Sequence, residues 1–210
     1  MKKAFKLFAI ALTASAMMFA CDNTDDPNNP DNPGNNDQPG DPVLIEENFD
    51  GGAMPSGWTN IDADADGYAW VHSSDFGAIT GNNASAGCVI SQSYDNNYGP
   101  LTPNNYLVTP VVKIPNGKYS VSWAVCGQDA SYANEYYEVH VGTVENGQFV
   151  SQKKIYSETV TAKAQGQWRT RTVELADFAG KEVAIAFRHC DVTDMFYLDL
   201  DDVKIFDNTL

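Results

Sequence analysis

Basic side chains are scarce in this sequence. Its 210 residues hold 13 Lys and Arg against 28 Asp and Glu, for a formal net charge of −15. Residues 1–20 contain three lysines and no acid, so the chain without them carries −18, and six aspartates in 21–42 leave −12 on 43–210. Binding to the phosphate backbone requires a basic face. We therefore expect no nucleic-acid partner, whereas the acidic excess suits divalent cations.

Residue patterns of known catalysts are also missing. The chain has three histidines and no HExxH or GxSxG motif, and its four cysteines form no CxxC pair or Cys/His metal spacing. Cys88, Cys126 and Cys190 are as consistent with buried apolar positions as with a disulfide, so no pairing is assigned. Paired carboxylates can hydrolyse glycosides, but acids are too abundant here for a pair to indicate this. We expect a protein that is not an enzyme, with a glycan-active or proteolytic enzyme as the weakest alternative.

No apolar run is long enough to span a bilayer, which takes roughly 20 residues. The longest, Leu7 to Ala20, follows Lys2, Lys3 and Lys6, an arrangement typical of a secretory signal. Cleavage after Ala14-Ser15-Ala16 would release a soluble protein. Cleavage before Cys21 would instead fit a bacterial lipobox, Met18 to Cys21, in which the cysteine is lipidated.

The segment after Cys21 favours lipidation. Residues 22–42 hold six Asp, six Asn and five Pro, with no apolar side chain besides proline. Such a composition cannot bury enough surface to fold. We expect a lipoprotein signal peptide over 1–20, lipidation at Cys21, a disordered acidic tether over 21–42 and one domain over 43–210. Acids soon after the cysteine, from Asp22 to Asp26, resemble a surface-export signal, which predicts an outer-membrane anchor facing the cell exterior.

The domain shows alternation of apolar and polar residues with a period of two, which predicts β-strands. In 118–126, for example, Tyr119, Val121, Trp123 and Val125 share one face. Further strands are expected over 43–49, 68–72, 87–93, 105–114, 136–141, 148–157, 167–175, 183–189 and 195–206. The pairs Asn116-Gly117 and Asn146-Gly147 each favour a tight hairpin. About ten short strands predict an all-β, antiparallel two-sheet sandwich, with a jelly roll preferred over other sandwiches.

Acidic residues cluster at two places that suit calcium. Asp62, Asp64 and Asp66, followed by Gly67, match the first half of an EF-hand loop, but Ser73 stands where the last ligand would be. A solvated acidic turn is the alternative.

The second cluster, Asp199, Asp201 and Asp202, lies in an apolar strand, where Asp is depleted. Leu198 and Leu200 have the opposite parity to Val203 and Ile205, which predicts a bulge that turns a carboxylate toward a ligand. A salt bridge to Arg188 is the competing interpretation. A third group, Glu46, Glu47 and Asp50, opens the domain.

Several segments together resemble the cleaved-adhesin domains of gingipain and haemagglutinin proteins, which belong with the choice-of-anchor J and MAM-like jelly rolls. They are GWTNIDADADGYAW (57–70), NNYLVTP (104–110), YYEVHVGT (136–143), QWRTRTVELADFAGKEVAIAFRH (167–189) and FYLDLDDVKI (196–205). The resemblance implies a jelly roll with structural calcium, a role in adhesion and no catalysis by the domain itself. It places the calcium ligands among Glu47, Asp62, Asp64, Asp66, Asp201 and Asp202. Unlike the family's arrays, this chain carries one copy on a tether.

These observations predict a calcium-stabilised binding module at the cell surface, for a host or matrix protein or a glycan. The aromatic and amide-rich loops suit such contacts, through Tyr94, Asn97, Tyr98, Tyr132 and Tyr136, although ordinary loop composition explains them equally well. The alternative is a structural or accessory subunit of an outer-membrane complex, which a large exposed apolar patch would favour.

Overall fold

The computed structural model describes residues 42–77, 79–162 and 165–209. The signal peptide, Cys21 and nearly all of the tether lie outside these residues and stay predictions. Within the described part of the chain, no helix has the length and apolar character needed to cross a membrane.

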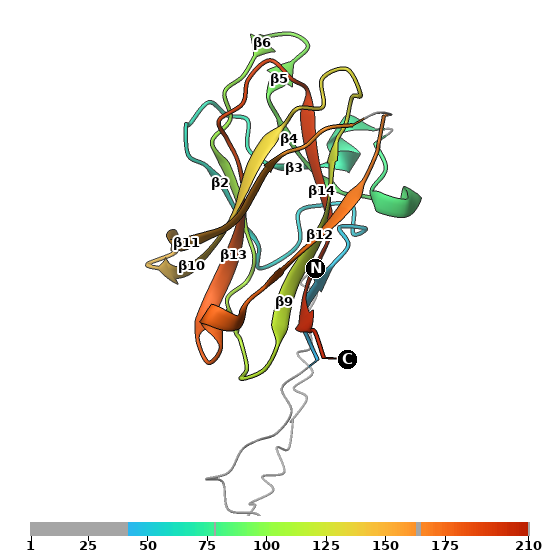
Figure 1. Ribbon diagram of the computed structural model, residues 1–210. Helices are drawn as coiled ribbons and strands as arrows, with labels where there is room; N and C mark the ends of the chain where they lie inside the picture. The colour runs from blue at the N-terminus through green and yellow to red at the C-terminus, as the bar shows by residue number, and fades with distance from the viewer. Residues whose placement is uncertain (1–41, 78, 163–164, 210) are drawn as a thin grey trace, which may run out of the picture. The chain divides into compact units, whose positions relative to one another are not determined.

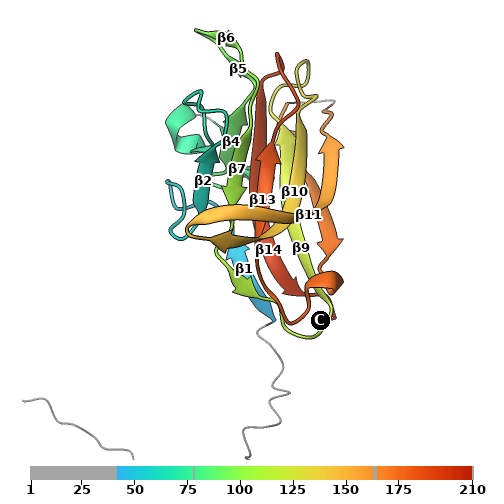
Figure 2. The same cartoon turned by 90° about the vertical axis from the view of Figure 1, so that its left-hand side faces the viewer.

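Two six-stranded sheets face each other (Figures 1 and 2). The β9 sheet has the order β12-β9-β14-β4-β3, with β1 added on β14, and the β10 sheet has the order β11-β10-β13-β7-β2, with β8 added on β13. The β9 sheet comprises β1 (Val43–Glu47), β3 (Val71–His72), β4 (Val89–Gln92), β9 (Tyr119–Gly127), β12 (Arg169–Glu174) and β14 (Tyr197–Asp207). The β10 sheet comprises β2 (Thr59–Asp62), β7 (Asn105–Val108), β8 (Val112–Lys113), β10 (Tyr136–Glu145), β11 (Gln148–Thr159) and β13 (Glu182–His189).

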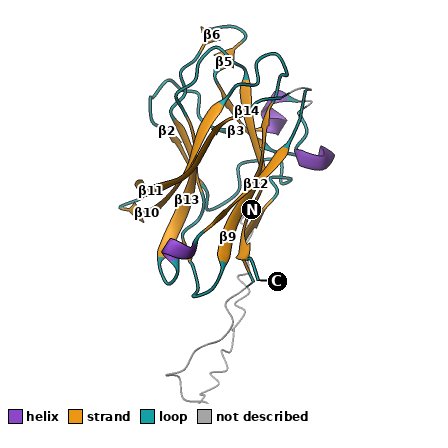
Figure 3. Ribbon diagram, viewed as in Figure 1, coloured by secondary structure: helices purple, strands orange, loops and turns teal. Residues whose placement is uncertain are grey.

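All strand pairs of both sheets are antiparallel, so the predicted all-β sandwich is confirmed. A separate ribbon of β5 (Tyr94–Asp95) and β6 (Gly99–Pro100) projects from one end. The helical elements described are short 3₁₀ turns in the connections, η1 (Ser73–Phe76), η2 (Asn82–Ala84) and η3 (Ala176–Phe178) (Figure 3).

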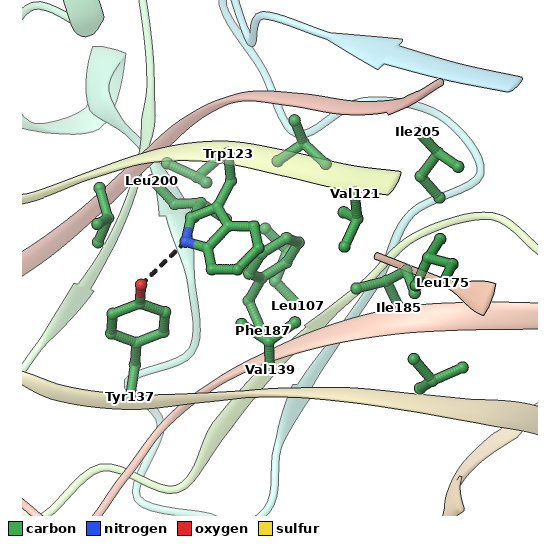
Figure 4. Close-up of a cluster of buried hydrophobic side chains, with 14 of the residues drawn as sticks. Leu107, Val121, Trp123, Tyr137, Val139, Leu175, Ile185, Phe187, Leu200 and Ile205 are labelled. Atoms are coloured by element: carbon green, nitrogen blue, oxygen red, sulfur yellow. Dashed lines mark hydrogen bonds between the residues drawn. The ribbon is translucent and has the colours of Figure 1, made fainter. Parts of the chain in front are cut away.

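The core forms where the alternating faces of the two sheets meet. Tyr119, Val121, Trp123 and Val125 of β9 are all buried in it, as the period-two pattern predicts. Trp123 lies at its centre, in edge-to-face contact with Tyr137, with ring centroids 6.4 Å apart. Its indole N–H donates to the Tyr137 hydroxyl over 2.9 Å, so the polar atom of each ring is satisfied inside the core (Figure 4).

A bulge interrupts β14 at the predicted place. Asp201 is opposite Ala124 and Lys204 is opposite Ser122, so β14 holds one extra residue there. Asp202 takes a left-handed φ of 48°. The extra residue changes the parity of the strand, and Leu198, Leu200, Val203 and Ile205 consequently all reach the core.

The two Asn-Gly pairs have different outcomes. Asn146-Gly147 joins β10 to β11, with Glu145 opposite Gln148 and both turn residues at positive φ, which confirms a two-residue hairpin of type I′. The hairpin predicted at Asn116-Gly117 is wrong, because β8 pairs with β13 and β9 pairs with β12 and β14. That turn carries the chain from one sheet to the other. A local sequence signal marks a turn but does not select the strand's partner.

Two strand predictions also need correction. The expected strand over 105–114 is divided into β7 and β8, since Pro110 lacks the N–H that a central strand donates. Residues 59–62 form β2, which sequence reasoning missed because TNID is polar and offers little apolar alternation.

The core geometry makes Trp123 a sensitive position. Replacement of Trp123 by Ala should lower the free energy of unfolding by about 3–5 kcal/mol, because it removes a fully buried indole and leaves the Tyr137 hydroxyl without this donor. Urea unfolding followed by circular dichroism measures this. Tyr98→Ala is the control: this side chain is 81% exposed, and the change should stay within about 0.5 kcal/mol. Equal losses in the two variants would contradict the assignment of Trp123 to the core.

Candidate functional site

Three connections meet at one end of the sandwich and enclose a hollow of about 360 Å³. They are the β5–β6 ribbon, the β9–β10 connection and the β13–β14 connection. We call this the loop-end hollow, and it is lined by Tyr94, Asn96, Asp129, Tyr132, Asp194, Met195 and Phe196. Its volume lies near the lower limit of small-molecule sites, about 300–1,000 Å³.

Main-chain hydrogen bonds hold these connections together. The N–H of Ser93 donates to the carbonyl of Phe196 over 3.0 Å, and the N–H of Asp194 donates back to the carbonyl of Ser93 over 3.2 Å. The N–H of Gln128 donates to the carbonyl of Tyr197 over 3.0 Å, which attaches the β9–β10 connection to the start of β14. Asp194 has a φ of 58°, a left-handed conformation that Asp tolerates better than most residues.

Glu135 lies at the end of the β9–β10 connection, and its side chain bonds to residues next to the other two connections. Its carboxylate is fully buried and accepts hydrogen bonds from the Ser93 hydroxyl and the Phe196 N–H, both over 2.8 Å. The other carboxylate oxygen lies 3.0 Å from Nε2 of His189, which is equally buried. Ser93 precedes Tyr94, and Phe196 lines the hollow, so this carboxylate fixes two walls of the site.

The network extends from His189 to Ser91. The carboxylate of Glu135 favours a proton on Nε2, so Nδ1 accepts from the Ser91 hydroxyl over 2.8 Å. Ser91, His189 and Glu135 thus form a Ser–His–acid chain, but the ring nitrogens are exchanged relative to a hydrolase triad, since Nδ1 rather than Nε2 faces the serine. All three are buried, and the Ser91 oxygen also accepts from the Asn105 amide. A substrate cannot reach this serine, and the arrangement supports the loops rather than chemistry.

The structure brings together two of the five predicted contact residues. Tyr94 and Tyr132 both line the loop-end hollow, and Tyr132 is 54% exposed. Asn97 and Tyr98 lie on the turn between β5 and β6, where Asp95 accepts from both of their N–H groups. Tyr136 is not part of the lining, and its hydroxyl donates to Glu138 over 3.3 Å.

Sequence reasoning missed Asp129, Asp194, Met195 and Phe196, which complete the hollow. Phe196 belongs to a string that was assigned to a strand, and its ring stacks on Tyr197 with centroids 3.8 Å apart. The aspartates had no signal, because a loop aspartate looks the same whether it caps a turn or faces a cavity.

A second hollow of about 630 Å³ shares Met195 with the first and includes Arg188, Asn104, Asn134 and Asp191 in its lining. Arg188 donates to Glu138 over 3.0 Å, so the predicted alternative, a salt bridge from Arg188 to the Asp201–Asp202 pair, is wrong. Burial alone would raise the pKa of Glu138. Hydrogen bonds from Lys154, His140 and Arg188 outweigh it and lower that pKa to about 2. Burial raises the pKa of the nearby Cys190 thiol to about 12, which makes it a poor nucleophile.

The first acidic cluster is gathered as predicted. Carboxylate oxygens of Asp62, Asp64 and Asp66 lie within 4.8 Å of one another. Asp62 accepts from the N–H groups of Ala65 and Gly67, which lowers its pKa, whereas burial and the neighbouring carboxylates raise the pKa of Asp64. This crowding of like charges is what a bound cation relieves.

The second acidic cluster is divided among different surroundings. Asp201 is buried, accepts from the Asn82 N–H and the Ser85 hydroxyl, and has its pKa raised by burial to about 6. Asp202 is exposed and accepts from the Asn82 amide over 2.9 Å. Glu47 accepts from the Phe49 N–H and lies opposite Val203. Among the described residues, Glu47, Asp201 and Asp202 do not come close enough together to form one group of metal ligands.

Asp199 is different again. It is fully buried on the outer side of the β9 sheet, opposite Ile90 and Cys126, and neither carboxylate oxygen has a hydrogen-bond partner among the described residues. Burial raises its pKa well above the ordinary range, which favours the neutral acid.

Comparison with known proteins shows the family of this chain. Residues 43–205 match the model of the Cleaved Adhesin Domain. Lys-gingipain W83 from Porphyromonas gingivalis is 43% identical over 193 residues, which are 86% of this chain and 11% of the gingipain. The chain thus spans about a tenth of the length of the curated relatives it matches.

Solved structures agree. The K1 cleaved adhesin domain of Lys-gingipain from Porphyromonas gingivalis W83 is 40% identical, with a TM-score of 0.67 over 78% of this chain and 98% of that domain. A family 22 carbohydrate-binding module of Clostridium thermocellum Xyn10B shares the fold at 12% identity, with a TM-score of 0.54 over 80% of this chain and 94% of the module. The chain, from its first strand to its last, belongs to the cleaved adhesin domain family.

Proposed function

We propose that this protein is a surface binding module of the adhesin type, and that it contacts an extracellular protein or glycan through the loop-end hollow. The observation that carries the proposal is the convergence of Tyr94, Tyr132 and Phe196 on one hollow. Buried or half-buried aromatic anchors in a pocket supply much of the energy of recognition. Binding, rather than catalysis, is also what the family name indicates.

The position of the hollow suits this role. The chain enters the domain at Val43, which pairs with Phe206 near the C-terminus, whereas β5 and β6 lie at the opposite end of the sandwich (Figures 1 and 2). A chain held at its N-terminal side would leave the far end free for contact. Large exposed apolar side chains in the described residues are few, namely Tyr98, Val111, Tyr132, Val144 and Val150. Tyr98 and Tyr132 belong to the loops at this end.

A panel of matrix proteins and neutral oligosaccharides should identify a ligand of residues 39–210, a segment comparable to the K1 domain that was solved alone. Tyr132→Ala should weaken binding to that ligand at least tenfold, because it removes one aromatic wall of the hollow. Val144→Ala, an exposed apolar residue on the β10–β11 hairpin, should bind as the original chain does. Unchanged binding by Tyr132→Ala would exclude the hollow as the contact site.

We also propose that the cleaved-adhesin domain holds structural calcium, with Asp62, Asp64 and Asp66 as its principal ligands. Calcium accepts six to eight oxygen ligands with flexible geometry. The three carboxylates supply oxygens from one turn, with no Lys or Arg in residues 59–70 to neutralise them. A second ion at the bulge would be held by only part of Asp201, Asp202 and Glu47, because these three do not form one group of ligands, and main-chain oxygens would complete its coordination.

Calcium should raise the thermal midpoint of residues 39–210. At 100 times its dissociation constant, an ion that binds only the folded state adds about 2.7 kcal/mol. Asp64→Ala should remove most of this gain, and Asp202→Ala, at the proposed second position, should reduce it to a smaller extent. Asp177→Ala, an exposed aspartate paired with Lys153, should retain it. Calorimetric scans with calcium and with excess chelator measure the effect, and identical midpoints would contradict structural calcium.

We further propose that the chain is exported and anchored by lipid on Cys21, in the outer membrane and facing the exterior. The proposal is supported by the order of segments along the chain. A basic start and a short apolar run precede Cys21, and an acidic tether with no apolar side chain besides proline follows it.

Replacement of Cys21 by Ala should move the protein from the membrane fraction to the soluble fraction, because no thiol remains there for the lipid. Immunoblots of fractionated cells expressing the full chain measure this. Cys88→Ala, at a buried cysteine of the domain, should stay with the membrane. If both variants distribute as the original chain does, the lipid anchor is wrong.

A further inference from the structure

Charge is distributed unevenly around the loop-end hollow. The connections that form it, residues 93–104, 127–135 and 190–196, contain no Lys or Arg. They contain Asp95, Asp129, Asp191 and Asp194, in addition to the buried Glu135. Among the described residues, none of these four aspartates is in a salt bridge. The carboxylates at this end are therefore not neutralised by cations of the chain itself.

Two of these carboxylates line the hollow itself. Asp129 uses one oxygen to accept from the N–H of Ser131 over 2.7 Å, a local turn contact. Its second oxygen has no hydrogen-bond partner among the described residues, and neither carboxylate oxygen of Asp194 has one. Aspartate accepts hydrogen bonds and does not donate them when ionised. A ligand that fits here must bring donors, preferably with positive charge.

Aromatic rings form the other walls. Tyr94, Tyr132 and Phe196 come from three different connections, and the Phe196 ring is held against Tyr197 at an interplanar angle of 15°. The faces of aromatic rings attract cations, and arginine also stacks on them. Carboxylates and aromatic faces in one hollow are the complement of a guanidinium group.

Charge separates this ligand from a sugar. A neutral sugar ring finds side-chain donors in Asn96 and the two tyrosine hydroxyls and acceptors in the carboxylates, but it brings no positive charge. It would also bury carboxylates without compensating their charge. A guanidinium brings five donors and a positive charge. The volume of about 360 Å³ admits one such side chain and not a long segment.

We propose that the loop-end hollow binds an arginine side chain presented by a partner protein. This rests on the proposed function of the hollow as the contact site and names the chemical class of its ligand. Asp129 and Asp194 receive the guanidinium N–H groups, and Tyr94, Tyr132 and Phe196 enclose the planar group.

Two tripeptides test the proposal, acetyl-Gly-Arg-Gly-amide and its citrulline counterpart, which has nearly the same shape and no charge. In ¹H–¹⁵N spectra of residues 39–210, the arginine peptide should shift the amides of Tyr132 and of 194–196 in a saturable way. The citrulline peptide should bind at least tenfold more weakly. Asp129→Asn and Asp194→Asn should each weaken arginine binding several-fold, because asparagine keeps the Asp129 turn contact and tolerates the positive φ of Asp194.

Asp177→Asn is the matched control, since it removes the same charge from an exposed site outside the hollow, and it should bind arginine as the original chain does. Equal binding of both peptides would overturn the cation preference while leaving the hollow as a contact site. Shifts of the same amides by xylohexaose but not by the arginine peptide would overturn the proposal in favour of a glycan. No shift with either probe would overturn it as well, and the Tyr132→Ala panel result would then decide separately whether the hollow binds anything.

Discussion

The buried carboxylate of Glu135 is the contact on which the loop end of the molecule depends. It accepts hydrogen bonds from Ser93 and Phe196 and pairs with His189, so one side chain connects residues from three distant parts of the sequence. A carboxylate in such a place is stable only when it is fully partnered. If the β9–β10 connection, which carries Glu135, moved away, Ser93, His189 and Phe196 would each lose this partner, so the carboxylate holds the aromatic walls in place without a ligand. A preformed site loses less entropy on binding.

The rest of the sandwich provides the hydrophobic core that stabilises the domain. Trp123 and its aromatic neighbours fill the space between the sheets, and the bulge at Asp201 lets β14 contribute to that core on both sides of the irregularity. In the proposed function, stability and recognition thus depend on different parts of the molecule. A cleaved adhesin domain and a family 22 carbohydrate-binding module share this fold, and what a domain of this fold binds depends on the site that it carries.

The sequence predicted the features that local pattern controls. Alternation in β9, the type I′ turn at Asn146-Gly147 and the bulge at Asp201–Asp202 each follow from residues close together in the chain. It could not predict which strands pair across the Asn116-Gly117 turn, because partners are chosen by the packing of the whole sandwich. For the same reason Tyr94 and Tyr132 were identified separately, and only the fold shows that they share a hollow with Asp194.

Charge affects the choice of partner both at a distance and at contact. The acidic excess of the domain attracts cationic partners and repels anionic ones, but at physiological salt this field decays over about 8 Å. It therefore affects the encounter and cannot by itself distinguish one basic surface from another. In the proposed arginine site, discrimination comes from Asp129 and Asp194, because three of their four carboxylate oxygens lack partners within the described residues and a ligand that fills the hollow displaces water from them. A ligand without a positive charge bears that desolvation uncompensated, so the same carboxylates that attract one class of partner exclude others.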